Sequence, residues 1–521
     1  MKSETIRWGL VGWWVILSIL LTGCQSLPSL EGRTQSQAYS KEQVADTYFA
    51  KALAPIEQQN GSKKSGIYPL IEADEAFAAR MMLAKYAQRS LDVQYYIWRH
   101  DMTGTMLFEA LHAAADRGVR VRLLLDDNNT NGAEPVLQAL HSHSNIEVRL
   151  FNPFMLRKPR WPGFVTDFSR LNRRMHNKSF TADNALTIIG GRNVGDEYFG
   201  ATDDVLFADL DVLTAGAAVQ DVSNDFDKYW RSASSYPLDR VVLSKHSMTL
   251  DDLRKEAQAI AASAGAQQYV ESLRESPFIT QLEEHNLGFE WLKVRMVSDD
   301  PRKGLGLAEK ESLLIQQFQD IIGNPTVDVE LVSPYFVPTE AGVDAFAWLV
   351  RQGVEVKVLT NSLSATDVSA VHAGYAKRRK ALLQSGVTLY EMQRHPTQVK
   401  KMKRKKRFLG SSGSSLHAKT FSVDRKHVFI GSFNFDPRSA NLNTELGFVI
   451  DSPQLAQRIN QAFYDEIPAH AYHVKLTPTG RIYWSEQQDW GVQTYTSEPH
   501  SSVWRRMTVR LFSWLPIEGL L

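Results

Sequence analysis

One stretch of this chain occurs twice, and it constrains the fold more than any other feature. HNKSFTADNALTIIGGRN begins at residue 176 and HAKTFSVDRKHVFIGSFN at residue 417, with seven of the eighteen aligned positions identical. Histidine, lysine, aspartate, glycine and asparagine recur at the same offsets, as His176, Lys178, Asp183, Gly190 and Asn193 and as His417, Lys419, Asp424, Gly431 and Asn434. This repetition predicts an internal duplication.

The residue types in the motif predict chemistry on a phosphate. A histidine can be a neutral nucleophile or a charged acid near neutral pH, and a lysine two residues on in a strand points to the same face. Two copies brought together offer two imidazoles, two ammonium groups and the amides of Asn193 and Asn434 to hold phosphate oxygens. Such a site needs no metal and no cofactor, so we expect neither. Asp183 and Asp424 are counted with the catalytic set, although spacing gives them no chemical role; we expect them to order the motif strand.

The duplicated motif resembles the HKD signature of the phospholipase D superfamily, with the bacterial cardiolipin synthase-like members most similar. The resemblance implies that His176 attacks the phosphorus to form a phosphohistidine, while His417 protonates the leaving alcohol. It also implies that an acid further along each half accepts a hydrogen bond from a motif histidine. Asp209 and Glu445 stand in such positions, with Asp211 as a competitor; surface ion pairs are the alternative for both acids.

Helix-like and strand-like segments alternate in the same order in both halves. The first half has helical patterns at 73–90, 103–117 and 133–141 and β-rich runs at 91–98, 119–125, 146–151 and 186–189. The second half has strand patterns at 327–332, 354–359 and 387–390 and helical patterns at 339–351 and 367–384. We therefore predict an α/β fold of two tandem phospholipase D-like units, each a mixed sheet flanked by helices, forming a pseudo-two-fold pair with one shared active site.

The composition is that of an ordinary globular protein. The 521 residues are 43% hydrophobic and 22% charged, with a formal net charge of +1, so charge alone indicates no partner. We predict a signal peptide (1–23), a tether (24–68), a first unit (69–231), a mostly helical connection packed across the back of the pair (232–304), a second unit (305–470) and a C-terminal segment with an amphipathic helix (471–521).

The N-terminus resembles a bacterial lipoprotein signal. Lys2 and Arg7 precede an apolar run from residue 8 to residue 21, and Thr22 and Gly23 lead to Cys24, the one cysteine of the chain. The run is shorter than the roughly 18–20 residues that span a bilayer, so a transmembrane helix is the less favoured alternative. We expect a lipid anchor on Cys24 and a catalytic part that faces the periplasm; whether the anchor lies in the inner or the outer membrane stays open.

Two segments ahead of the motifs are candidates for contact with anionic groups. Residues 154–174 mix Arg and Lys with Phe, Trp and Pro, and residues 400–407 (KKMKRKKR) hold seven basic residues in eight. Both can bind lipid headgroups or nucleic acid phosphates, and the second can also be a solvated loop. Residues 503–515 place tryptophans and leucines near one helical face with three arginines off it, which is typical of an interfacial helix or of a helix docked on the core.

These observations favour a membrane-associated phosphatidyltransferase. The resemblance implies that it makes cardiolipin from phosphatidylglycerol and a second phospholipid. A hydrolase of phospholipids would carry the same motifs, and a nuclease would use the basic segments for DNA. The anchor and the Trp-rich C-terminus favour lipid, so we expect no nucleic acid partner. A non-enzymatic scaffold is disfavoured because both motifs are complete.

Overall fold

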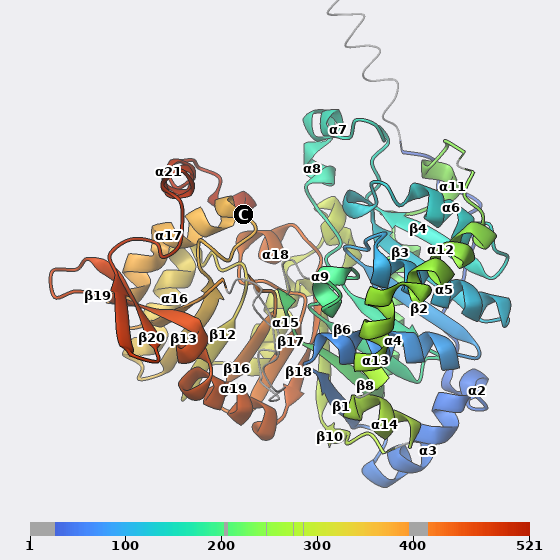
Figure 1. The fold of residues 1–521 in the computed structure, drawn as a ribbon, viewed down its shortest axis with the longest axis horizontal. Coiled ribbons are helices and arrows are strands. Elements are labelled where there is room, and N and C mark those ends of the chain that lie inside the picture. The colour runs from blue at the N-terminus through green and yellow to red at the C-terminus, as the bar shows by residue number, and fades with distance from the viewer. Residues whose placement is uncertain (1–26, 203–206, 246, 275, 285, 395–414) are drawn as a thin grey trace, which may run out of the picture.

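Two large mixed sheets, one from each half of the chain, form the framework of the computed structural model (Figure 1). It describes residues 27–202, 207–245, 247–274, 276–284, 286–394 and 415–521. The first sheet contains β1 (Ser65–Leu70), β2 (Ser90–Tyr95), β3 (Arg120–Asp126), β4 (Ile146–Phe151), β5 (Ser179–Ala182), β6 (Leu186–Gly190), β8 (Asp211–Gly216), β9 (Ser235–Pro237) and β10 (Glu290–Leu292). The second contains β11 (Val294–Ser298), β12 (Asp328–Val332), β13 (Glu355–Asn361), β14 (Thr388–Met392), β16 (Thr420–Val423), β17 (His427–Gly431), β18 (Leu446–Asp451), β19 (Ala471–Leu476), β20 (Ile482–Gln488) and β21 (Gly491–Tyr495).

The strand orders show the duplication directly. Within the first sheet the order β1-β8-β6-β5-β2-β3-β4-β9 matches β11-β18-β17-β16-β12-β13-β14-β19 within the second. In both, three parallel strands adjoin a motif hairpin that pairs antiparallel to the first of them. The predicted fold of two tandem units with mixed sheets is therefore confirmed.

Helices cover the faces of both sheets (Figure 1). The first unit has α4 (Ala73–Tyr86), α5 (Met102–Asp116), α6 (Glu134–His141), α7 (Trp161–Thr166), α8 (Phe168–Leu171), α9 (Asp196–Phe199), α10 (Ala217–Arg231) and α11 (Leu238–Val241). The second unit has α15 (Leu314–Ile322), α16 (Thr339–Arg351), α17 (Ser369–Gln384), α18 (Pro437–Asn441), α19 (Pro453–Asp465), α20 (Ile467–His470) and α21 (Val503–Phe512).

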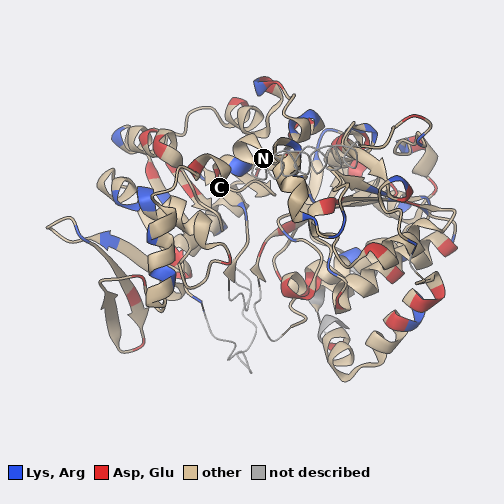
Figure 2. Cartoon of the chain, turned by 90° about the horizontal axis from the view of Figure 1, so that it is seen from above, with Lys and Arg blue, Asp and Glu red and all other residues tan. Residues whose placement is uncertain are grey.

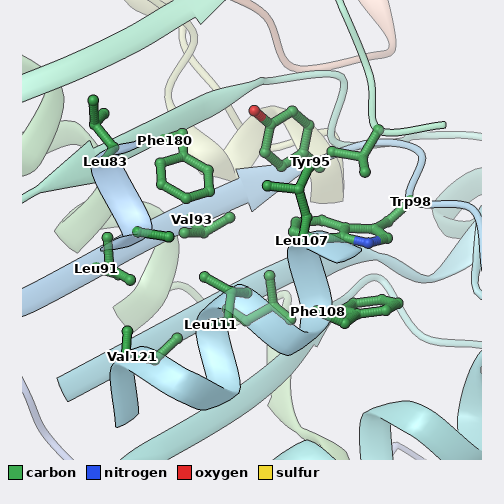
Figure 3. Packing of buried hydrophobic residues seen from close by; sticks show 14 of the residues in the cluster. Leu83, Leu91, Val93, Tyr95, Trp98, Leu107, Phe108, Leu111, Val121 and Phe180 are labelled. Atoms are coloured by element: carbon green, nitrogen blue, oxygen red, sulfur yellow. The ribbon is translucent and has the colours of Figure 1, made fainter. Parts of the chain in front are cut away.

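The core of the first unit lies between its sheet and the helices α4 and α5. Val93 and Phe180 of the sheet and Leu107 and Leu111 of α5 are fully or almost fully buried and point toward one another (Figure 3). Alternate residues of β2 face these helices because successive strand side chains point to opposite faces. Burial of such side chains contributes about 1.5–3 kcal/mol each, so this packing fixes the strands that carry the first motif.

The two units share a second hydrophobic core where the sheets approach each other. Ile189 and Val212 of the first sheet pack with Ile430 and Phe448 of the second. A short two-stranded sheet of β7 (Phe207–Ala208) and β15 (Ser415–Leu416) also joins the halves. Strands from both halves therefore meet where the two motif hairpins lie.

Two expected segments differ from the structure. Residues 27–68 of the expected tether are ordered: α2 (Lys41–Val44) and α3 (Tyr48–Asn60) precede β1, and Phe49 and Leu53 are buried in the first core. Apolar residues at helical spacing inside a polar segment provide this packing. The connection does not lie across the back of both units. Its helices α12 (Leu250–Ala262), α13 (Ala264–Arg274) and α14 (Pro277–Glu283) pack on the first unit, because Leu253 and Phe278 enter that core.

Acidic and basic residues alternate along the outer helices of both halves in the view from above (Figure 2). This distribution agrees with the formal net charge of +1. Among the helices that the structure describes, none is long and apolar enough to cross a bilayer. Residues 1–23, predicted as a signal peptide, and Cys24 lie outside the described residues.

Candidate active site

Each motif histidine stands just ahead of its motif strand and is fixed by the other half of the chain. The His176 backbone N–H donates to Thr444 O at 2.8 Å, and the His417 N–H donates to Ala208 O at 2.8 Å. Thr444 directly precedes Glu445, and Ala208 directly precedes Asp209. The backbone of each histidine is thus held beside the acid of the opposite unit.

The acids bind the histidine rings in the same crossed manner. His176 Nδ1 lies 2.8 Å from Glu445 Oε2, and His417 Nδ1 lies 2.5 Å from Asp209 Oδ2. Asp211 lies elsewhere: its carboxylate accepts hydrogen bonds from Arg80 at 2.8 Å and from the backbone N–H of Arg192 at 3.1 Å. Both histidines and both acids are buried, and His176 and Lys178 act electrostatically on His417, so the four groups form one enclosed site contributed by both units.

The surroundings of His176 fix which ring nitrogen carries the proton. Nδ1 also lies 3.1 Å from Ser432 O, a carbonyl that can only accept. Burial alone would raise the pKa of Glu445, but the His176 ring, Lys178 and the Ser432 hydroxyl bring that pKa below its usual value. Burial lowers the pKa of His176 to about 4. A neutral His176 therefore donates from Nδ1 to an ionised Glu445, which leaves the Nε2 lone pair for attack on an electrophile.

His417 has a different balance of charge. Burial raises the pKa of Asp209 above its usual value, although Lys419 and Arg192 oppose the rise. Burial, reinforced by Lys419 and Lys178, holds the pKa of His417 well below its usual value. Because Asp209 binds Nδ1 and orients the ring, we assign the exchange of a proton with the substrate to Nε2 of His417.

The two motif lysines are buried cations next to the histidines. Lys178 Nζ donates to His176 O at 2.5 Å, and Lys419 Nζ lies 2.8 Å from His417 Nδ1 and 3.1 Å from Nε2. Burial lowers the pKa of Lys178 to about 7 and that of Lys419 to about 8. A buried ammonium favours an anionic ligand, because the anion compensates the charge that burial destabilises.

The motif asparagines are buried near the same residues. Asn193 accepts the Ile97 backbone N–H through Oδ1 at 3.2 Å, and the backbone N–H of Asn434 donates to Ser439 Oγ at 3.3 Å. Each follows the motif hairpin of its own unit by three residues. Each asparagine therefore follows its hairpin at the end where the motif histidine stands.

The motif aspartates stand at the far ends of the hairpins and do not join this site. Asp183 accepts backbone N–H groups of Gln88, Arg89 and Ser90 at 2.7–3.2 Å, and Asp424 accepts those of Thr326 and Val327 at 2.8–3.1 Å. These bonds tie each hairpin to the start of the neighbouring strand. Asp183 and Asp424, which we counted with the catalytic residues, therefore have a structural role, because neither carboxylate contacts a motif histidine.

Several site residues lie outside the sequence prediction. Ser432 Oγ donates to Glu445 Oε2 at 2.5 Å, and Ser439 Oγ donates to Glu445 Oε1 at 2.7 Å. The position of Ser432, directly after Gly431 in the motif hairpin, was the available signal. Tyr96 contacts the His176 ring and Tyr198 the His417 ring, with ring centroids 4.9 and 5.2 Å apart. No periodicity singles out these tyrosines.

Of the two basic segments ahead of the motifs, the structure describes only residues 154–174. The segment 400–407 lies outside the described residues. In 154–174, most of the cations bind internal partners: Arg157 and Arg160 pair with Asp127 and Glu134, and Arg174 pairs with Asp126. These arginines therefore brace the insertion on the first unit and are not free to hold a headgroup.

Known proteins resemble the chain in sequence and in fold. Residues 81–230 and 318–467 each match the family described as "Cardiolipin synthase, PLD-like domain". Cardiolipin synthase C of Escherichia coli is 50% identical over 474 residues, which cover 91% of this chain and 99% of that protein. A cardiolipin synthase of Clostridium perfringens is 22% identical and covers 78% and 71% of the two chains. The structure of phosphatidylserine synthase from Haemophilus influenzae has a TM-score of 0.57 at 12% identity, over 90% of this chain and 100% of that one.

Proposed function

Because this chain belongs to the family of cardiolipin synthases with phospholipase D-like domains, we propose that it is a phosphatidyltransferase that makes cardiolipin. It moves a phosphatidyl group from a donor phospholipid to the glycerol hydroxyl of phosphatidylglycerol. The observation that carries the proposal is the crossed pairing, His176 with Glu445 and His417 with Asp209, which gives one site two histidines, each oriented by an acid of the opposite unit.

The reaction proceeds in two displacements. His176 Nε2 attacks the phosphorus of the donor, the bond from phosphorus to the headgroup oxygen breaks, and His417 gives its proton to that oxygen. The acceptor hydroxyl then loses its proton to His417 and attacks the phosphorus, and the bond to His176 breaks. Lys178 and Lys419 neutralise the phosphate oxygens throughout, and Glu445 stabilises the positive ring that forms at His176.

Enclosure of the site supports transfer over hydrolysis. His176 is 6% and His417 7% exposed, and aromatic rings of Tyr96 and Tyr198 lie against them. A phosphohistidine formed in such a site meets few water molecules, so an alcohol delivered by a second lipid has the advantage.

Product analysis tests the proposal. Purified protein is incubated with labelled phosphatidylglycerol and phosphatidylethanolamine, separately and mixed, with His176→Ala as the inactive control. We expect labelled cardiolipin and a free small alcohol. Phosphatidic acid as the main product would assign a hydrolase, and turnover of DNA without turnover of lipid would assign a nuclease.

We also propose that the protein is anchored through a lipid on Cys24 in the bacterial cell envelope, with the site facing the periplasm. The charged and apolar N-terminal pattern supports this placement. Metabolic labelling with a fatty acid tests it: label should enter the chain and disappear in Cys24→Ser. Label that persists in Cys24→Ser, or no label in the parent chain, would refute the anchor.

A further inference from the structure

Exposed apolar side chains gather on two elements of this molecule. Ten of the nineteen exposed large hydrophobic residues of the described chain lie on α7–α8 or on α21 and the turn after it. They are Trp161, Phe164, Val165 and Phe168, and Val503, Trp504, Met507, Leu511, Trp514 and Leu515. Trp161, Trp504 and Trp514 are 67%, 78% and 77% exposed. Contiguous exposed apolar groups of this kind mark an interaction surface, whereas scattered ones do not.

The α7–α8 insertion leaves the same edge of the first sheet that carries the histidine. It follows the carboxyl end of β4, and His176 precedes β5, whose Ser179 pairs with Gln94 near the carboxyl end of β2. Because β2, β3 and β4 are parallel, both features stand at one edge. Asn152 Nδ2 donates to Arg173 O at 2.8 Å and fastens the base of the insertion there.

The C-terminal helix has the matching place on the second unit. Arg505 of α21 donates to the carbonyl of Thr366, in the loop between β13 and α17, and Val509 is buried against Ala373 of α17. The residue at the end of β13, Asn361, exchanges two hydrogen bonds of 2.9 and 3.0 Å with Leu416, the neighbour of His417. The helix is therefore docked on the core by one face, and its opposite face, with Trp504 and Leu511, is exposed.

One arginine ties both elements to the site. The Arg438 side chain donates to Asn172 O and Oδ1 at 3.0 and 2.6 Å, and to Leu520 O at 3.1 Å. Asn172 ends α8, Leu520 follows α21, and Arg438 adjoins Ser439, which binds Glu445. Figure 1 shows α7, α8 and α21 rising from the same side of the two units, with α18, the helix of Arg438, between them.

We propose that α7–α8 and α21 form a two-part docking face that seats the active site on a bilayer containing anionic lipid. The proposal rests on the proposed function and names the surface through which this site reaches its lipids. Tryptophan side chains favour the level of the lipid headgroups, and arginine and lysine attract anionic headgroups. The helix α21 has three arginines and no acid, and Arg510 on it and Lys158 before α7 are exposed. A flat bilayer can contact both separated elements at once.

Fluorescence quenching tests the placement. Three variants of the full chain, Phe168→Cys, Trp504→Cys and Trp490→Cys, are each labelled with an environment-sensitive probe on the introduced cysteine. The parent chain, labelled in the same way, gives the signal that comes from Cys24. Trp490 is the matched control, since it is 72% exposed but lies in the turn between β20 and β21. In vesicles of phosphatidylglycerol and phosphatidylethanolamine that contain shallow nitroxide lipids, probes at 168 and 504 should be quenched and the probe at 490 should not.

Kinetics separate docking from chemistry. The pairs Trp161→Asp with Phe168→Asp and Trp504→Asp with Trp514→Asp should each lower kcat/KM on vesicles at least tenfold. On a monomeric short-chain phosphatidylglycerol their kcat/KM should equal that of the parent chain, which also shows that they fold. Unquenched probes at 168 and 504, together with unchanged kinetics on vesicles, would overturn the docking face and leave these surfaces to a protein partner. Quenched probes on a parent chain that turns over no phospholipid would refute the proposed function alone.

Discussion

One difference between the two motif copies contributes to the opposite pKa shifts of Glu445 and Asp209. At the position after the motif glycine the first copy has Gly191 and the second has Ser432. A Cβ at Gly191 would lie 2.1 Å from Asp209 Oδ1, so the carboxylate itself occupies that space. Glu445 instead receives the Ser432 hydroxyl. The extra donor stabilises the ionised form of Glu445, while Asp209, which lacks it, has a raised pKa.

Removal of this hydroxyl should slow the chemistry. In Ser432→Ala, Glu445 loses a hydrogen bond to a charged group, which contributes about 1.5–3 kcal/mol and corresponds to roughly 10–100-fold in kcat. Steady-state kinetics on mixed lipid vesicles measure the effect. Ser422→Ala is the matched control, because Ser422 is buried in the motif hairpin and its hydroxyl has no hydrogen-bond partner among the residues that the structure describes. Equal kcat in the two variants would remove Ser432 from the positioning of Glu445.

The pH dependence of kcat/KM should report the buried groups. His176 must be neutral, and with a pKa lowered to about 4 it is neutral at all higher pH. Lys178 and Lys419 must be charged, and with pKa values of about 7 and 8 they lose their charge as the pH rises through this range. The profile should therefore be a bell with an acid limb near 4 and an alkaline limb between about 7 and 8. An acid limb at the ordinary histidine value would contradict the burial argument.

At the scale of the element, the motif hairpins explain why the motif contains an aspartate. Asp183 and Asn184 have φ of 52° and 46°, and Asp424 and Arg425 have φ of 54° and 51°. These residues begin three-residue loops, each closed by a hydrogen bond, from Ala185 N–H to Ala182 O and from Lys426 N–H to Val423 O. Aspartate and asparagine tolerate positive φ better than most residues. The same carboxylates accept the N–H groups of the adjoining strand, so they fix the register of the strand behind the histidine.

Substitution of a motif aspartate should therefore reduce stability more than catalysis. Asp424→Ala loses the hydrogen bonds to Thr326 and Val327 and should lower the free energy of unfolding by about 1–3 kcal/mol. Urea unfolding measures the loss, and kcat of the folded protein should stay near the parent value. Asp344→Ala, at an exposed position of α16, is the control. Full stability with kcat lost would return Asp424 to the catalytic set.

Regular elements could be predicted from the sequence because their patterns are local. The strand at 146–151 and the helix at 339–351 coincide with β4 and α16, and the other predicted strands and helices differ by a few residues at their ends. The helix predicted at 73–90 ends at Tyr86 because residues 90–95 pair in the sheet as β2. The packing of helix α3 on the first core was not predicted, because the helix buries only Phe49 and Leu53 and the rest of its sequence is mostly polar.

At the scale of the whole molecule, the two units make a single site by exchanging acids. The sequence indicates Asp209 and Glu445 through their similar distance from each motif, but it does not indicate the partner of each. The crossed pairing depends on how the units dock, through the core that contains Ile189 and Phe448 and through the short pairing of β7 with β15. Contacts between residues more than two hundred positions apart leave no periodicity in the sequence.

The site assembled from both units must balance the negative charge of the phosphate, and we expect it to do so without a metal ion. Lys178 and Lys419 supply two cations beside the histidines, so we expect turnover of lipid to survive EDTA at full rate. The assay uses protein dialysed against chelator, with and without added Mg²⁺ or Ca²⁺. Loss of turnover in EDTA that a divalent ion restores would contradict this expectation.

The count and position of covalent adducts test the central claim, which is that one shared site uses His176 to attack the phosphorus and His417 to donate the proton. In His417→Asn incubated with phosphatidylglycerol, release is slowed, and intact-mass analysis followed by peptide mapping under non-acidic conditions should find one phosphatidyl group per chain, on His176. The reciprocal His176→Asn should carry none. An adduct on His417 in His176→Asn would contradict the account, since it would show either reversed roles or two independent sites.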